Sequence, residues 1–205
     1  MATNANYTTL VQNECDDTSA GALTIIQQYV KETYQEVIRR VGKYLIAPTV
    51  EDTPVSISDG TYTPTTPWME LIGAYYKSAG GTNFSELKEI SQEEYRDTYQ
   101  NMTDGQPTHF VQEGTGIRIV PSPSDAGTLR TISIAVQAEL TNGQVSIIPD
   151  RFEHVIKYGA SYKYKAFDDN PAATEFERYY LKGLSEMEQE LSSRTVVKKP
   201  KLFGM

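Results

Sequence analysis

The sequence predicts an α+β protein, in which a small bundle of long α-helices packs with an antiparallel β-sheet and hairpins, with extended N- and C-terminal arms. Three stretches repeat apolar residues every three or four positions, which is the period of an amphipathic helix. Shorter runs between the first and second stretch alternate apolar and polar residues. Clusters of Pro, Gly, Ser and Asp separate these runs, and this pattern is typical of strands joined by turns.

The N-terminal residues 1–18 are expected to form an extended arm. Thr18 or Ser19 can cap the element that follows, because a hydroxyl there accepts a bond from a free backbone N–H. Residues 20–46 carry apolar residues at helical spacing, so they are predicted to form one helix of roughly 40 Å. Pro48 ends this helix.

A Pro- and Thr-rich insert at residues 47–67 contains a strong hairpin signal. Asp59-Gly60 supplies the positive φ values of a type I′ turn, and the flanking residues alternate, which predicts a hairpin over residues 54–64. Two short strands alone are only marginally stable. The hairpin is therefore expected to pack against neighbouring elements or to project outward.

The main sheet is expected over residues 68–76 and 107–140. Residues 68–76 are apolar and are predicted to form a strand that enters the core. In the second range, two alternating runs flank a Pro/Ser/Asp/Gly cluster at 121–127, which predicts a hairpin.

The second strand of that hairpin alternates cleanly. Ile132 and Ile134 share one face, and Thr131 and Ser133 share the other. This alternation predicts a half-buried antiparallel strand with a polar outer face.

Two further helices are predicted at residues 149–167 and 171–193. Pro149 and an acid after it suit a first helical turn, and Asn170 is the expected cap of the last helix. Residues 19–193 are expected to form a single domain.

Composition excludes several classes of function. The chain has 205 residues, a net charge of −8 and 14 Tyr against 6 Phe. An acidic chain argues against tight nucleic-acid binding, which needs clustered Lys and Arg. The single cysteine, Cys15, cannot form an intrachain disulfide. We expect no signal peptide, because the start lacks a basic and apolar pattern, and no membrane span.

Charge is distributed unevenly. Residues 194–205 carry four basic residues and no acid, so the other residues hold 15 of the 19 basic groups and all 27 acidic groups. A basic tail on an acidic body suggests an arm that docks on a different acidic surface. A solvated terminus is the alternative.

Residues with catalytic or ligand chemistry are sparse. Neither His109 nor His154 has a His or Cys partner at metal-ligand spacing. The sequence has no nucleophile elbow and no phosphate-binding Gly motif. We therefore predict no catalytic residue, no metal site and no cofactor. Tyr and Lys residues between positions 157 and 180 leave two readings open, namely base stacking with phosphate binding, or a helix–helix core with hydroxyls at its edge.

Several motifs follow one another in a suggestive order. The first motif is a hairpin that begins at Pro107-Thr108-His109-Phe110 and is built on residues 117–123. The second is Ile148-Pro149-Asp150-Arg151-Phe152, which begins a helix that continues through Ile156-Lys157-Tyr158-Gly159-Ala160. A final helix carries residues 177–181 and ends in the tail. Over residues 20–195 the chain resembles the head-to-tail adaptor, or connector, proteins of tailed bacteriophages.

The resemblance implies a structural protein of the virion neck, assembled in the host cytoplasm. It would form a ring, usually twelve-fold, beneath the capsid portal, extend the DNA channel and give tail proteins a platform. The implied partners are further copies of the chain, the portal protein and a tail, nozzle or tail-tube protein. Genomic DNA would pass without specific binding, and no membrane is involved.

The resemblance also implies a portal-docking segment over residues 194–205, with apolar anchors and basic residues that meet acidic portal residues. Its residues are Arg194, Val196, Val197, Lys198, Lys199, Lys201, Leu202, Phe203 and Met205. The candidates for contact with a neighbouring subunit or the tail are Ile57, Asp59, Tyr62, Arg130, Thr131 and Ser133.

Two other interpretations stay open. The chain could be a small soluble enzyme or ligand-binding domain that uses the Tyr-rich helix pair as its pocket, and substituting His154 and Asp168 would then abolish its activity. It could also be another neck or tail-completion protein of a virion.

Overall fold

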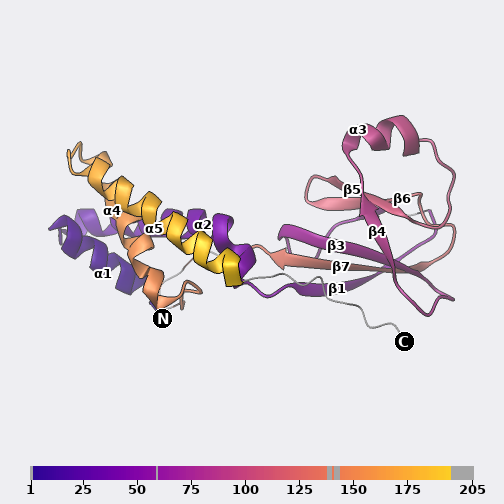
Figure 1. Cartoon of the computed structure of the whole chain (residues 1–205), viewed down its shortest axis with the longest axis horizontal. Coiled ribbons are helices and arrows are strands. Elements are labelled where there is room, and N and C mark those ends of the chain that lie inside the picture. The colour runs from indigo at the N-terminus through magenta and orange to yellow at the C-terminus, as the bar shows by residue number, and fades with distance from the viewer. Residues whose placement is uncertain (1, 59, 138–139, 141–143, 195–205) are drawn as a thin grey trace. The chain divides into compact units, whose positions relative to one another are not determined.

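The computed structural model describes residues 2–58, 60–137, 140 and 144–194, and the chain divides into two compact units (Figure 1). The helical unit takes residues from both ends of the chain, up to Ile46 and from Gln137 onward, and the sheet unit takes Ala47–Val136. We expected one domain over residues 19–193. The contacts instead group these residues into two units.

The helical unit contains four α-helices. They are α1 (Asn4–Cys15), α2 (Ala20–Leu45), α4 (Glu153–Phe167, after a 3₁₀ turn at Asp150–Phe152) and α5 (Ala173–Arg194). The three helices predicted from the sequence are present, and each of their bounds lies within four residues of the expected one. Ser19 caps α2 by accepting a bond from the Ala22 N–H at 3.2 Å, and Asn170 accepts a 2.9 Å bond from the Ala172 N–H before α5.

The expected N-terminal arm is wrong for residues 4–15, which form α1. Thr3 caps this helix, and Tyr7 and Val11, one turn apart, are fully buried in the core shared with α2 and α4. The Asn4 amide donates a 2.9 Å bond to the Leu140 carbonyl. Only two apolar side chains direct this helix inward, so the sequence pattern was too weak to predict it.

The sheet unit contains seven strands and a short helical segment. The strands are β1 (Thr49–Val55), β2 (Thr61–Tyr62), β3 (Trp68–Ser78), β4 (Ser85–Glu89), β5 (His109–Glu113), β6 (Gly116–Val120) and β7 (Gly127–Ala135), and α3 (Gln92–Glu94) with a π-helical turn (Tyr95–Tyr99) lies between β4 and β5. The strand order is β1-β7-β3-β4-β5-β6-β2. Because β4 and β5 pair in parallel, the sheet is mixed, whereas a purely antiparallel sheet was expected.

The predicted hairpin at residues 54–64 is wrong. β1 pairs with β7 and β2 pairs with β6, so these consecutive strands form opposite edges of the sheet. Seven strands in a flat sheet would separate the edges by roughly 29 Å, but the six Cα steps from Val55 to Thr61 reach at most about 23 Å. The sheet must therefore curl, and Thr65 bonds Glu51 of β1 at 2.7 Å on the way from β2 to β3.

The predicted hairpin at residues 117–136 is also wrong as a pairing, although both strands exist. β6 lies between β5 and β2, and β7 lies between β1 and β3. Alternation and turn residues identified the strands correctly. They could not identify the partners, because the link at residues 121–126 crosses the end of the curled sheet instead of turning back beside β6.

The curled sheet encloses its own core. The inward side chains include Leu87, Phe110, Ile117, Ile119 and Leu129. Since side chains alternate along a strand, Thr131 and Ser133 share the inward face of Leu129.

Both faces of β7 are nevertheless buried. Ile132 and Ile134, on the other face, are 4% and 3% exposed. The expected half-buried strand with a polar face in solvent is therefore wrong, since its polar residues point into the curl.

Candidate functional site

The expected portal-docking segment can be placed only at its first residue. Arg194 is the last residue of α5. Val196, Val197, Lys198, Lys199, Lys201, Leu202, Phe203 and Met205 lie outside the described residues. Their role stays a prediction from the sequence.

The six contact candidates separate into different environments. Tyr62, Thr131 and Ser133 are 7%, 1% and 9% exposed, so the expectation that they offer a contact surface is wrong. The Tyr62 ring stacks on Trp68 at 6.0 Å, and burial raises the pKa of its hydroxyl. Asp59 lies outside the described residues, and Ile57 is 60% exposed.

Arg130 is the sixth candidate, and it is already engaged within the unit. Its guanidinium donates two 2.7 Å hydrogen bonds to the Asp52 carboxylate of β1 and lies 4.0 Å from the centroid of the Phe84 ring. The paired guanidinium lowers the pKa of Asp52. Arg130 therefore joins β1, β7 and the β3–β4 connection, and this structural role accounts for its conformation.

Ion pairs join the helices of the helical unit. Lys157 of α4 pairs with Glu14 of α1 at 2.9 Å, and Arg40 of α2 pairs with Glu188 of α5 at 2.8 Å. Lys163 of α4 reaches Glu36 of α2 at 2.7 Å. These pairs lie at the partly exposed edges of the helix contacts, whose centre is the apolar core.

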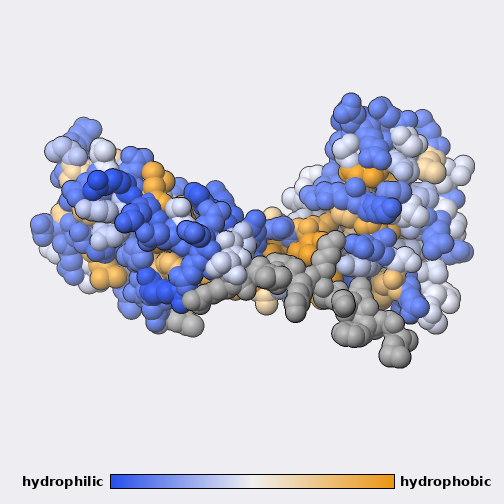
Figure 2. All heavy atoms as spheres, in the orientation of Figure 1, coloured by the Kyte–Doolittle hydropathy of each residue, from blue (hydrophilic) through white to orange (hydrophobic). Residues whose placement is uncertain are grey.

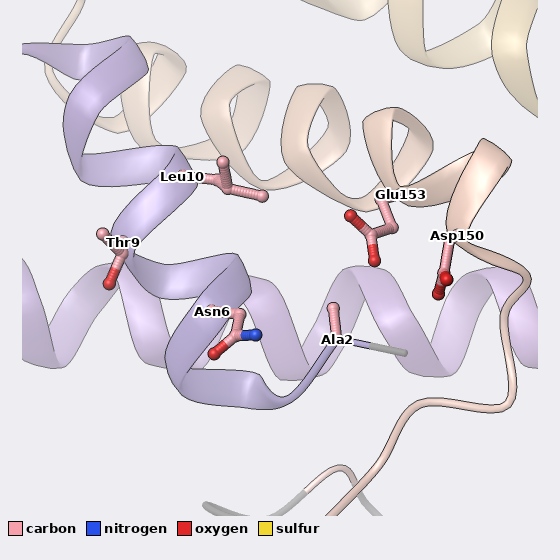
Figure 3. A pocket seen from close by; sticks show the side chains of 6 residues that line it. All are labelled: Ala2, Asn6, Thr9, Leu10, Asp150 and Glu153. Carbon is pink, nitrogen blue, oxygen red and sulfur yellow. The ribbon is translucent and has the colours of Figure 1, made fainter.

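One open hollow lies between α1 and the start of α4 (Figure 3). Its volume is about 540 Å³, and its lining residues are Ala2, Asn6, Thr9, Leu10, Asp150 and Glu153. The Leu10 and Glu153 side chains extend toward each other across it (Figure 3). An apolar side chain beside two carboxylates suits a contact with a protein surface of mixed character.

A second hollow of about 510 Å³ lies among α2, α4 and α5. Its lining residues are Tyr29, Glu36, Tyr162, Lys163, Ala166, Phe167 and Tyr180. Phe167 is 63% exposed, and its ring lies 6.5 Å from that of Tyr29. The lining is therefore largely aromatic, and it includes the Lys163–Glu36 ion pair.

The Tyr-rich helix pair forms a packed seam. Tyr180 is buried in the helical core, and the centroid of the Tyr158 ring lies 6.0 Å from that of Phe176 and 5.3 Å from that of Tyr179. These contacts favour the reading of a helix–helix core with hydroxyls at its edge. The Tyr180 hydroxyl points to Glu36 at 3.4 Å, and burial raises its pKa to about 12.

The residues invoked for an enzyme are not brought together. His154 is in the first turn of α4 and Asp168 follows its last residue, which places them roughly 20 Å apart along the helix axis. The other histidine, His109, packs against the Tyr99 ring at 5.1 Å in the sheet unit.

Metal ligands and the thiol are the other groups that could carry chemistry. Within the described residues, no group of three or more His, Cys, Asp or Glu side chains is placed to hold a metal. Cys15 ends α1, and burial raises the pKa of its thiol.

Sequence reasoning missed several exposed apolar residues. Leu10, Met102, Phe167 and Leu181 are 38%, 51%, 63% and 52% exposed. Apolar spots on both units stand among mainly hydrophilic residues (Figure 2). The exposure of Leu181 could have been predicted, because this residue falls outside the apolar stripe of its helix. Leu10 and Met102 lie in stretches without a clear hydrophobic period, so their exposure could not be predicted.

A family model described as SU10 adaptor protein matches residues 5–199. The chain therefore belongs to this family of phage head-to-tail adaptor proteins. No curated protein matches it.

Membership has coarse consequences for function. The family is one of structural phage proteins, which act in the virion neck and interact with portal and tail proteins. Among the described residues, no helix combines the length and apolarity that crossing a membrane requires.

Proposed function

We propose that the chain is the subunit of a closed ring. This ring lies under the portal, extends the DNA channel and carries the tail. Twelve copies would match the symmetry expected from the resemblance. The observation that carries this proposal is the match of residues 5–199 to the adaptor family.

The charge of the body supports a DNA conduit. Residues 47–136 hold 12 acidic and 5 basic residues, and residues 1–46 with 137–193 hold 15 acidic and 10 basic residues. Phosphates are repelled by such surfaces, so the genome can pass without sticking. The channel would thus conduct DNA without binding it specifically.

The exposed side chains of the helical unit support ring contacts. A closed ring needs two unlike surfaces on each subunit. The unit has an acidic hollow with Leu10 between α1 and α4, and an aromatic hollow with Phe167 among α2, α4 and α5. The linings of the two hollows differ in chemistry, since one is acidic and the other largely aromatic, so we propose them as the two unlike surfaces.

Residues 194–205 are proposed to dock on the portal. Their four basic residues would pair with acidic portal residues, and Leu202, Phe203 and Met205 would enter apolar pockets. A segment that orders on binding gives up entropy, but repetition around a ring multiplies the contact.

Mixing the purified chain with its portal and imaging the complex by electron microscopy tests the ring. We expect a ring of this chain on one end of the portal. Deletion of residues 194–205 is expected to abolish portal binding, and a variant with Lys198, Lys199 and Lys201 changed to Gln to bind more weakly. Unchanged portal binding by the deletion variant would show that docking lies elsewhere.

A further inference from the structure

Three loops at one end of the curled sheet form a single block, termed here the distal loop platform. It comprises residues 56–58, 100–107 and 121–126. Residues 56–58 follow β1 directly and residues 121–126 directly precede β7, at the end of the sheet where Val55 pairs with Gly127. Residues 100–107 lie beside them, because Gly105 forms a β-bridge with Pro123. The chain enters and leaves the sheet unit at the opposite end, where Thr49 pairs with Ser133.

Hydrogen bonds interlock the three loops. The Ser58 N–H donates to the Pro123 carbonyl at 2.9 Å, and the Ser58 hydroxyl donates to the Asp104 carboxylate. The Gly105 N–H donates to Ser122 at 2.8 Å, and its carbonyl accepts from the Ser124 N–H at 3.0 Å. A surface held in this way loses little entropy when a partner binds it.

The backbone of the platform is also held in an uncommon conformation. Ser58 has a φ of 61°, in the left-handed region that residues other than glycine seldom adopt. Such conformations persist where surrounding contacts impose them, and they gather at functional sites. Ser58 follows Ile57 directly.

Two large apolar side chains stand exposed on this rigid block. Ile57 is 60% exposed and Met102 is 51% exposed. The bond between Ser58 and Asp104 brings their loops together, since Ile57 is one residue from Ser58 and Met102 is two residues from Asp104. Exposed apolar side chains on an ordered surface are typical of contact sites, and their burial would favour binding.

The charge of the platform selects among partners. Its three segments contain Asp104 and Asp125 and no Lys or Arg. In the proposed function the contacts between copies are already assigned to the two hollows of the helical unit, and the portal contact to residues 194–205. A partner with an apolar contact face and a basic rim fits instead.

We propose that the distal loop platform is the surface through which the chain holds a tail protein, whose contact face is apolar and rimmed by Lys or Arg. This inference rests on the proposed function. It assigns the tail contact to Ile57 and Met102, at the far end of the sheet unit from its chain entry.

Photo-crosslinking in intact virions tests the assignment. A photoreactive amino acid is placed at position 57 or 102, with position 181 on α5, where Leu181 is 52% exposed, as the control. We expect positions 57 and 102 to cross-link to one tail protein identified by mass spectrometry, and position 181 not to do so. Cross-links from 57 and 102 to the portal or to another copy would overturn the assignment. Absence of the chain from purified virions would instead refute the proposed function.

A double variant, Ile57→Asp with Met102→Asp, gives a second readout. Both side chains are exposed, so folding is expected to be retained, and circular dichroism checks this. We expect the yield of tailed particles to fall about tenfold or more, while the variant still occupies the heads. The control Val50→Asp changes another exposed residue, on β1. An unchanged yield for the double variant would overturn the proposal.

Discussion

Arg130 and Asp52 lie directly opposite each other on β7 and β1, and two parallel hydrogen bonds of 2.7 Å join them. The Phe84 ring covers the guanidinium at 4.0 Å. One residue thus connects the edge strand, the strand beside it and the β3–β4 connection, on the outside of the curled sheet.

Changing Asp52→Asn removes the charge of this pair and retains the shape of the side chain. We expect the free energy of unfolding to fall by about 1 kcal/mol, since the pair is bidentate but partly exposed. Urea denaturation measures it. Glu186→Gln is the matched control, because its partner Lys182 is 3.8 Å away and both side chains are largely exposed. If both variants lost the same free energy of unfolding, the Arg130–Asp52 pair would contribute no more than an exposed ion pair.

The same pair predicts a dependence on acid. Because Arg130 lowers the pKa of Asp52 below its ordinary value of 3.8, the pair contributes stability above that value and loses it as the pH falls through the lower folded pKa. We expect the stability difference between the wild type and Asp52→Asn to be constant near about pH 7 and to shrink below about pH 4. A difference that grew in acid would contradict this assignment.

Gly159 of α4 permits close packing of three helices. A Cβ there would lie 2.5 Å from Thr33 Cγ2 of α2 and 2.8 Å from the Tyr180 ring of α5. We expect Gly159→Ala to destabilise the protein by about 1–3 kcal/mol through overpacking. Gly21→Ala is the control, since no atom lies within 4 Å of its Cβ position, and alanine favours the helix. Thermal denaturation of both variants measures the contrast, and a Gly159→Ala variant as stable as Gly21→Ala would exclude the tight crossing.

Three tyrosines are expected to resist alkali. Burial raises the pKa of Tyr7 and Tyr180 to about 12, and the hydrogen bond to Asp17 does the same for Tyr164. A tyrosine whose pKa is raised by folding contributes its full stability below the ordinary pKa of 10.0. This stability is lost as the pH rises toward 12. An ultraviolet titration should show that the hydroxyls of Tyr7, Tyr164 and Tyr180 ionise after those of the other tyrosines. We expect the protein to unfold between pH 10 and about pH 12. Tyr164→Phe should remove part of this dependence. Early ionisation of all tyrosines in folded protein would contradict the packing.

Helices were the most predictable part of the fold. The apolar stripe of α2 and the caps at Ser19 and Asn170 are local features, and the structure confirms them. The helix α1 was missed because its inward face consists mainly of Asn4, Tyr7, Thr8 and Val11, and half of these are polar.

Strand pairing could not be predicted from local pattern. Asp59-Gly60 and the Pro121–Gly127 cluster suggested hairpins, but the strands on either side of each pair with other partners. The error carried into the site, since Thr131 and Ser133 were expected in solvent and lie within the curl. Hydroxyl groups are buried here because the sheet curls, which is a tertiary effect. The alternation of apolar and polar residues along one strand cannot predict it. Met102 carried no signal at all, because its exposure depends on three loops that are distant in sequence.

The most direct test of the central claim is a structure of the neck in purified virions by electron cryomicroscopy. We expect a closed ring of this chain between the portal and the tail, with residues 194–205 on the portal and Ile57 and Met102 against a tail protein. A neck that lacks this chain, or one in which the chain is bound as single copies without a ring, would contradict the proposed function.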